Sequence, residues 1–140
     1  MNSEKEKIWL DDREIICVYS KGKVRRLKLS EILYFEVIKH EIYIHIVSVK
    51  EQGEKRNEVL NFRDTISDVE KMLKEKEFLR VHTGYLVNLQ HMISFDDTEI
   101  VLTGNISVKI PKTRVKEVQK KLLEYTKFPW CIEKDKDVLT

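Results

Sequence analysis

The apolar residues of this chain change their spacing along the sequence, and the changes predict strands, a helix, more strands and a second helix. Short runs rich in β-branched and aromatic residues fill the first half, among them "IICVY" (15–19) and "EILYFEV" (31–37). The run "IYIHIVSV" (42–49) alternates with period two, which is typical of a half-buried strand. The expected inward positions are Val24, Leu27 and Leu29 after a turn at Gly22, and then Ile42, Ile44 and Ile46, with Tyr43, His45 and Val47 outward.

A helical period appears in "DTISDVEKMLKEKEF" (64–78), with Thr65 as the expected N-cap and Asp68 at the capping-box position. This helix is expected to end near residues 75–77. A second helix is predicted in "TRVKEVQKKLLEYT" (113–126). The expected inward residues are Ile66, Val69, Met72 and Leu73 in the first helix, and Val115, Val118, Leu122 and Tyr125 in the second.

Between the two helices the β pattern returns in five short segments, "FLRVH", "YLVNL", "MISFD", "TEIVL" and "ISVKI". The whole pattern predicts a mostly β fold with about nine or ten short strands and two short helices. Closely spaced strands of this kind favour a stack of small antiparallel sheets, or a sandwich, over a parallel α/β sheet. The first ten residues are expected to form a loose lead-in.

Composition narrows the class of protein. The 140 residues fit one domain, and a 41% hydrophobic content is enough to bury a core. No run of 18 apolar residues and no signal-peptide pattern is present, so no membrane partner is expected. The two cysteines, Cys17 and Cys131, are too few and too far apart for a disulfide framework or a zinc site. We expect a cytoplasmic protein without a metal or cofactor.

The net charge of +2 conceals two basic clusters. Segment 15–30 carries five cations and no acid, and segment 109–121 carries six cations and one acid, Glu117. Such clusters are typical of a surface that faces a polyanion, but they also occur as ordinary solvated faces, and charge alone favours the latter. The cations are Lys21, Lys23, Arg25, Arg26 and Lys28 in the first cluster, and Lys109, Lys112, Arg114, Lys116, Lys120 and Lys121 in the second.

Enzyme signatures are missing from the sequence. It contains no phosphate-binding glycine loop, no nucleophile elbow and no pair of histidines at the i, i+4 spacing of a helical metal site. The acidic pair Asp11–Asp12 precedes an apolar strand, whereas in a receiver domain such a pair follows one. No catalytic residue and no small-molecule substrate are therefore expected; a hydrolase using His82 with a distant carboxylate is kept as a remote alternative.

Three polar residues interrupt the apolar stretch "EFLRVHTGYLVNLQHM" (77–92): His82, Thr83 and Asn88. Asn88 lies inside an apolar run, so we interpret it as a buried amide that satisfies backbone groups. His82 and Thr83 lie where one strand gives way to the next, and loops at such junctions present contacts on a rigid β scaffold. The alternative for His82 is a hydrogen bond to nearby backbone, with no further role.

Three segments in order resemble the LytTR domain of bacterial transcription regulators: "ILYFEVIKHEIYIH" (32–45), "FLRVHTGYLVNL" (78–89) and "VKIPKTRVKEV" (108–118). The family pattern has an "I-x-Y-x-E" strand, a helix, "F-x-R-V-H-x-S-Y-L-V-N", and then "I-P-x-S-R" opening a helix. The resemblance implies an elongated, mostly β fold that binds DNA through loops. It places the domain at residues 13–126, between a lead-in (1–12) and a C-terminal tail (127–140) in which Trp130 is an expected aromatic anchor.

The resemblance also implies where DNA is contacted. In this chain the loop after the "YFEV" strand contains Lys39 and His40. The motif histidine is His82, and the contact residue that follows it is Thr83. The arginine that opens the last helix corresponds to Arg114, beside Lys112 and Thr113, and Thr113 keeps a hydroxyl that could cap this helix. Two departures are Thr83 and Gly84, which stand where the family often has a longer polar residue and serine. For Arg114 the alternative is an ion pair with Glu117, and for His40 an ordinary turn residue.

These residues predict a sequence-specific transcription regulator whose partner is double-stranded DNA. Its site is expected to be a tandem of half-sites in the major groove, with two copies side by side as a possible homodimer. The chain shows no receiver domain of its own, which fits a stand-alone regulator or a cloned fragment equally. The main alternative is a protein-binding module that keeps the fold and has lost DNA binding.

Overall fold

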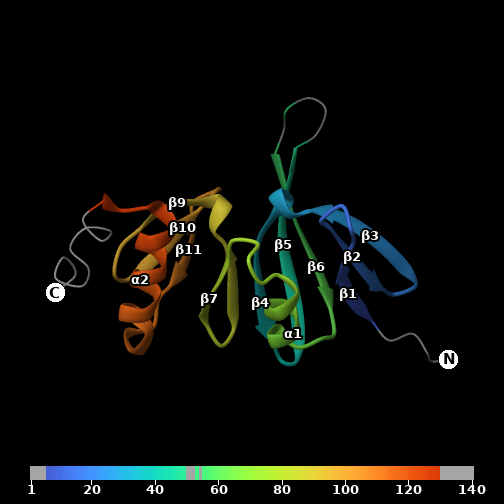
Figure 1. Cartoon of the computed structure of the whole chain (residues 1–140). Coiled ribbons are helices and arrows are strands. Elements are labelled where there is room, and N and C mark those ends of the chain that lie inside the picture. Colours follow the sequence, from blue (N-terminus) through green and yellow to red (C-terminus); the bar gives the residue numbers. More distant parts are fainter. Residues whose placement is uncertain (1–5, 50–52, 54, 130–140) are drawn as a thin grey trace. The chain divides into compact units, whose positions relative to one another are not determined.

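A computed structural model describes residues 6–49, 53 and 55–129 and is mostly β (Figure 1). In these residues eleven strands form three antiparallel sheets, accompanied by two α-helices, which confirms the predicted fold class. The chain forms two compact units that divide after Met92. Trp130 and Cys131 lie outside the described residues, so the predicted aromatic anchor stays a prediction.

The first unit consists of a three-stranded sheet, a five-stranded sheet and one α-helix. The smaller sheet has the order β1-β2-β3, and the larger has the order β6-β5-β4-β8-β7. Short 3-10 turns follow β3 and β8, at Leu29–Glu31 and Leu89–His91. The elements are β1 (Lys7–Leu10), β2 (Ile15–Ser20), β3 (Lys23–Lys28), β4 (Ile32–Ile38), β5 (Glu41–Val49), β6 (Lys55–Phe62), α1 (Ile66–Met72), β7 (Phe78–His82) and β8 (Tyr85–Asn88).

Both sheets and α1 bury their apolar faces in one core. Strand β5 contributes Ile42, Ile44 and Ile46, which are essentially inaccessible, as their alternation predicts. Helix α1 adds Ile66 and Val69, and the Thr65 hydroxyl caps it by accepting a hydrogen bond from the Asp68 N–H at 3.1 Å. The other buried members of the core are Ile8, Ile16, Val18, Leu27, Ile32, Phe35, Phe62, Leu73 and Leu86.

The second unit is a three-stranded sheet with one α-helix. Its strands are β9 (Met92–Phe95), β10 (Glu99–Leu102) and β11 (Ile106–Lys109), and α2 spans Val115–Thr126 after a 3-10 turn at Lys112–Arg114. The Gln119 side chain donates a hydrogen bond to the Asp96 carbonyl in the β9–β10 connection, which ties α2 to the sheet. Val118 and Leu122 are buried as predicted, Leu123 is buried too, and Val115 and Tyr125 are half-buried.

Three sequence predictions about the local structure of the first unit were wrong. Residues 7–10 are not loose, because β1 pairs along its whole length with β2. Val24 is 51% exposed, because it is opposite Tyr19 on the outward face of the small sheet while Leu27, an odd number of residues away, points inward. Helix α1 ends at Met72, before the expected range of 75–77, and turns lead from it into β7.

Candidate nucleic-acid interface

Two hairpin turns lie at the same end of the five-stranded sheet. Strand β4 pairs with β5 on one side and with β8 on the other, both antiparallel. The β4–β5 turn therefore lies next to the start of β8, where the Val37 N–H donates to the Gly84 carbonyl at 3.0 Å. This arrangement brings the adjacent residues Lys39 and His40 into the neighbourhood of Thr83, which lies far from them in the sequence. All three side chains are exposed.

The β4–β5 turn holds two residues in a left-handed conformation. Ile38 is paired with Glu41, and the two residues between them, Lys39 and His40, have φ of 47° and 71°. Two positive φ values are the pattern of a type I′ hairpin turn, which ordinarily selects Asn-Gly. The β2–β3 turn has the same pattern with Lys21 and Gly22, at 56° and 77°. His40 thus occupies the position that glycine fills in the neighbouring hairpin, and its backbone is strained.

Replacing His40 with glycine should stabilise the fold. Glycine adopts a positive φ without the steric cost that a Cβ imposes, so we expect the free energy of unfolding to rise by about 0.5–1 kcal/mol. Urea denaturation followed by circular dichroism measures the change, and Gly22→His is the reciprocal control, expected to destabilise. An unchanged or lower stability of His40→Gly would show that the histidine side chain makes a compensating contact.

The β7–β8 turn is shaped by His82, not by Thr83. The Gly84 N–H donates to Nδ1 of His82 at 3.1 Å, and the His82 ring meets the Tyr85 ring edge-on with centroids 4.6 Å apart. The side chain of Thr83 stays exposed at the tip. The prediction that His82 chiefly positions this loop agrees with these contacts, and base contact by Thr83 stays a prediction.

Asn88 is the buried structural amide that the sequence predicted. It is the only fully buried polar residue in the described part of the chain, at 0% exposure. Its Nδ2 donates to the carbonyls of Leu29 and Ile32, at 3.1 and 2.8 Å, and its Oδ1 accepts from the Gln90 N–H at 3.0 Å. Every polar atom of the amide therefore has a partner, and β8 is linked to the turn that precedes β4.

A polar aromatic network covers the outward face of β4, β5 and β8. Glu36 lies at its centre, 2.7 Å from His45 Nε2, and accepts a hydrogen bond from the Tyr85 hydroxyl at 2.9 Å. The Tyr34 ring stacks on His45 with centroids 4.1 Å apart. Burial, helped by the Glu36 carboxylate, raises the pKa of Tyr34 to about 12, and the hydrogen bond to Glu36 raises the pKa of Tyr85. The network holds β8, and hence the turn before it, against β4.

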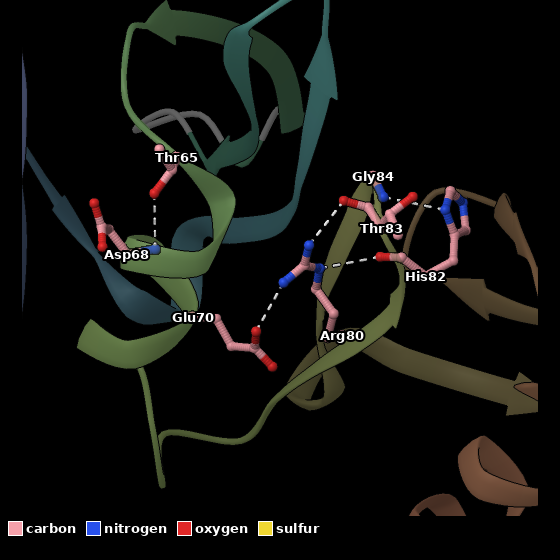
Figure 2. A network of polar contacts seen from close by, with 7 residues as sticks. All are labelled: Thr65, Asp68, Glu70, Arg80, His82, Thr83 and Gly84. Atoms are coloured by element: carbon pink, nitrogen blue, oxygen red, sulfur yellow. Dashed lines mark hydrogen bonds and ion pairs between the residues drawn. The ribbon is translucent and has the colours of Figure 1, made fainter.

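Arg80 is a further residue of this site that sequence reasoning missed. Figure 2 shows its guanidinium between Glu70 of α1 and the backbone of the β7–β8 turn. It donates to Glu70 Oε1 at 2.8 Å, to the His82 carbonyl at 3.1 Å and to the Thr83 carbonyl at 2.9 Å. Its place in the segment "FLRVHTGYLVNL" was the available signal, but spacing alone does not reveal bonds to backbone carbonyls.

The second set of candidate residues lies in the other compact unit, at the start of α2. Lys112 and Thr113 are exposed in the 3-10 turn, and Arg114 is the N-cap residue of α2. The expectation that Thr113 caps α2 was wrong, since the 3-10 turn moves the cap position to Arg114, where no side chain caps the helix. Arg114 Nε lies 3.3 Å from Glu117 Oε1, the ion pair weighed as the alternative. Exposed pairs of this kind are weak and can be exchanged for another anion.

The fold treats the two basic clusters differently. In the first, Arg25 makes a two-pronged ion pair with Glu58 at 2.9 and 3.2 Å, and Arg26 lies 3.7 Å from Asp11. Acids distant in sequence therefore offset part of its charge. In the second, Arg114 pairs with the nearby Glu117, and the five lysines, Lys109, Lys112, Lys116, Lys120 and Lys121, are all exposed. The second cluster is the better candidate for a surface that binds a polyanion.

Among the described residues, no group of three or more histidine, cysteine or acidic side chains is placed to hold a metal ion. No helix in the same part of the chain is long and apolar enough to cross a membrane.

The comparison with protein families gives a match over residues 22–123 to the LytTr DNA-binding domain. The chain belongs to the LytTR family. The matched range contains both hairpin turns and the start of α2.

A solved structure supports the LytTR fold. It is described as the LytTr DNA-binding domain of a methyl-accepting/DNA response regulator from Bacillus cereus. The two chains are 15% identical, with a TM-score of 0.61, and the match covers 77% of this chain and 95% of that one. At this identity the likeness concerns the fold alone. No curated protein matches the chain at a significant level.

Proposed function

We propose that this LytTR domain is a sequence-specific regulator of transcription that binds double-stranded DNA in the cytoplasm. The family match over residues 22–123 carries the proposal, because it spans both sets of candidate contacts. The exposed turn residues Lys39, His40 and Thr83 supply one set. Lys112, Thr113 and Arg114 supply the other. His82 belongs with the first set, because it accepts a hydrogen bond from the Gly84 N–H and so shapes the turn that carries Thr83.

The chemistry of each set suits a different part of the duplex. Arginine offers two parallel donors to guanine O6 and N7, so Arg114 is the residue best suited to read a base. Exposed lysines at the start of a helix bind phosphate oxygens and fix the register without reading sequence. Turn side chains such as His40 and Thr83 can reach base edges with single hydrogen bonds. Binding as two copies to tandem half-sites stays a prediction of the family resemblance.

The expected salt dependence tests whether DNA is bound at all. Each phosphate neutralised by a lysine or arginine releases counterions, so log affinity should fall linearly with log salt. With about four phosphate contacts, raising the salt from about 50 to about 200 mM should weaken binding roughly a hundredfold. Fluorescence anisotropy with a labelled duplex measures this. Lys120→Ala and Lys121→Ala should each reduce the slope by about one if those lysines contact phosphate.

A flat response over the same salt range would favour the alternative, a protein-binding module on this fold that has lost DNA binding. The preferred sequence is found by selecting bound duplexes from a random library. Enrichment of a common sequence supports the regulator, whereas salt-sensitive binding without enrichment would leave only a non-specific DNA-binding domain.

A further inference from the structure

One side chain, that of Arg80, joins the backbone of the β7–β8 turn to helix α1. Arg80 lies on β7, and its three donors reach acceptors on two different elements (Figure 2). Two acceptors are the carbonyls of His82 and Thr83, which are the backbone of the turn itself. The third is Glu70 on α1, a helix that is anchored in the core by Ile66 and Val69.

The geometry suits a positioning role better than a DNA contact. The side chain of Arg80 is only 18% exposed, and all three kinds of guanidinium nitrogen are engaged at 2.8–3.1 Å. A phosphate would have to displace these bonds before it could use the guanidinium. Thr83 is the exposed residue of the turn: its carbonyl accepts a hydrogen bond from Arg80 at 2.9 Å, while the residue remains accessible to solvent.

We propose that Arg80, braced by Glu70, is a positioning residue that holds the β7–β8 turn in the conformation from which Thr83 reads a base. This inference rests on the proposed DNA-binding function and assigns to Arg80 a role distinct from the contacts themselves. Lysine cannot replace the arginine. An ammonium on a flexible stem is a single point donor and cannot bridge a carboxylate and two carbonyls at fixed spacing, although it keeps the charge.

The test compares five proteins: wild type, Arg80→Lys, Thr83→Val, the double variant, and Arg25→Lys as the matched control. Arg25 also makes an arginine–glutamate pair, but it bonds Glu58 on another strand and has no bond to the turn. Affinities are measured on the selected duplex and on a scrambled duplex at one salt concentration. Amide NMR spectra of the free proteins follow Thr83 and Gly84, and urea denaturation checks that each variant is folded.

Arg80→Lys should weaken binding to the selected duplex by roughly five- to tenfold, the worth of about one hydrogen bond, and leave the scrambled duplex unaffected. The amide signals of Thr83 and Gly84 should shift. The double variant should bind no more weakly than the weaker-binding of the two single variants, because both substitutions abolish the same base contact, that of Thr83. Arg25→Lys should match wild type on both duplexes. If Arg80→Lys is less stable, Glu70→Gln should reproduce part of the loss in discrimination through the same brace.

Three results would overturn the positioning role. Arg80→Lys could distinguish the selected from the scrambled duplex as well as wild type does, or it could lose affinity equally for both duplexes. The third result is a double variant whose fold-loss in affinity is the product of the two single fold-losses. The last two would indicate a phosphate contact and an independent base contact, respectively. A wild-type protein that prefers no duplex would overturn the proposed function itself and this inference with it. Discrimination by the wild type therefore separates the two kinds of failure.

Discussion

Replacing Asn88 with alanine should lower the free energy of unfolding by about 3–5 kcal/mol. The substitution leaves the carbonyls of Leu29 and Ile32 and the N–H of Gln90 without the amide that pairs them; the bond to Ile32 is fully buried, and the other two are partly buried. Each unsatisfied buried group costs about 1–3 kcal/mol, and local relaxation recovers part of that. A domain of this size has a total stability of about 5–15 kcal/mol, so the loss should be plain in a urea titration.

Two further variants separate hydrogen bonding from size. Asn88→Asp conserves the volume and the acceptor for Gln90, but it places a carboxylate against two carbonyls, so it should be at least as destabilising as alanine. Gln90→Ala, at the exposed neighbouring position, should stay within about 0.5 kcal/mol of wild type. An Asn88→Ala protein within about 1 kcal/mol of wild type would mean that the three bonds contribute little to stability.

Replacing Arg114 with alanine should cost roughly 1–3 kcal/mol of binding free energy on the selected duplex, if this side chain reads a guanine. On a scrambled duplex the loss should be much smaller, because only one charge is removed. Arg114→Lys should not restore the affinity, since an ammonium lacks the planar pair of donors. Anisotropy titrations of both duplexes at one salt concentration give the comparison.

The ion pair at the start of α2 supplies the control for Arg114. Glu117→Gln removes the carboxylate that lies 3.3 Å from Nε, so Arg114 no longer has to exchange that partner for DNA. This variant should bind both duplexes slightly more tightly. Lys120→Ala and Lys121→Ala should weaken both duplexes alike, if they act at all. Equal losses for Arg114→Ala on both duplexes would reduce Arg114 to a phosphate contact and leave specificity with the Lys39–His40 turn.

The sequence predicted features that follow from local pattern. The alternation in β5 identified Ile42, Ile44 and Ile46 as core residues, and the change of period at Thr65 identified the cap of α1. Asn88 was recognisable as structural because an amide inside an apolar run is buried, and a buried amide needs protein groups as hydrogen-bond partners. These successes depend only on the side-chain direction of a strand, on cap chemistry and on the cost of burying polar atoms.

Features that depend on distant partners were not predictable in this way. Val24 was assigned an inward position from the alternation of its segment, together with Leu27 and Leu29, but the register with Tyr19 directs it outward. The brace formed by Arg80 requires a helix residue ten positions earlier and two carbonyls beyond it, which no periodicity encodes. The prediction that Thr113 caps α2 was wrong for a local reason: residues 112–114 form a 3-10 turn, which no residue type in this segment predicts. The DNA contacts came from the resemblance, and binding experiments decide them.

The strand order of the larger sheet has a consequence for folding. Strands β4, β5 and β6 are joined by two consecutive hairpins, so they can pair as soon as they are made. Strand β4 stays an edge strand until β8 pairs with it. That pairing joins Phe35 to Leu86 across about fifty residues, and such non-local contacts form slowly. Until then the backbone beside Phe35 is open to another chain, as in any unpaired edge. Aggregation during refolding should therefore begin at β4, and a protein cut short before β8 should expose this edge permanently.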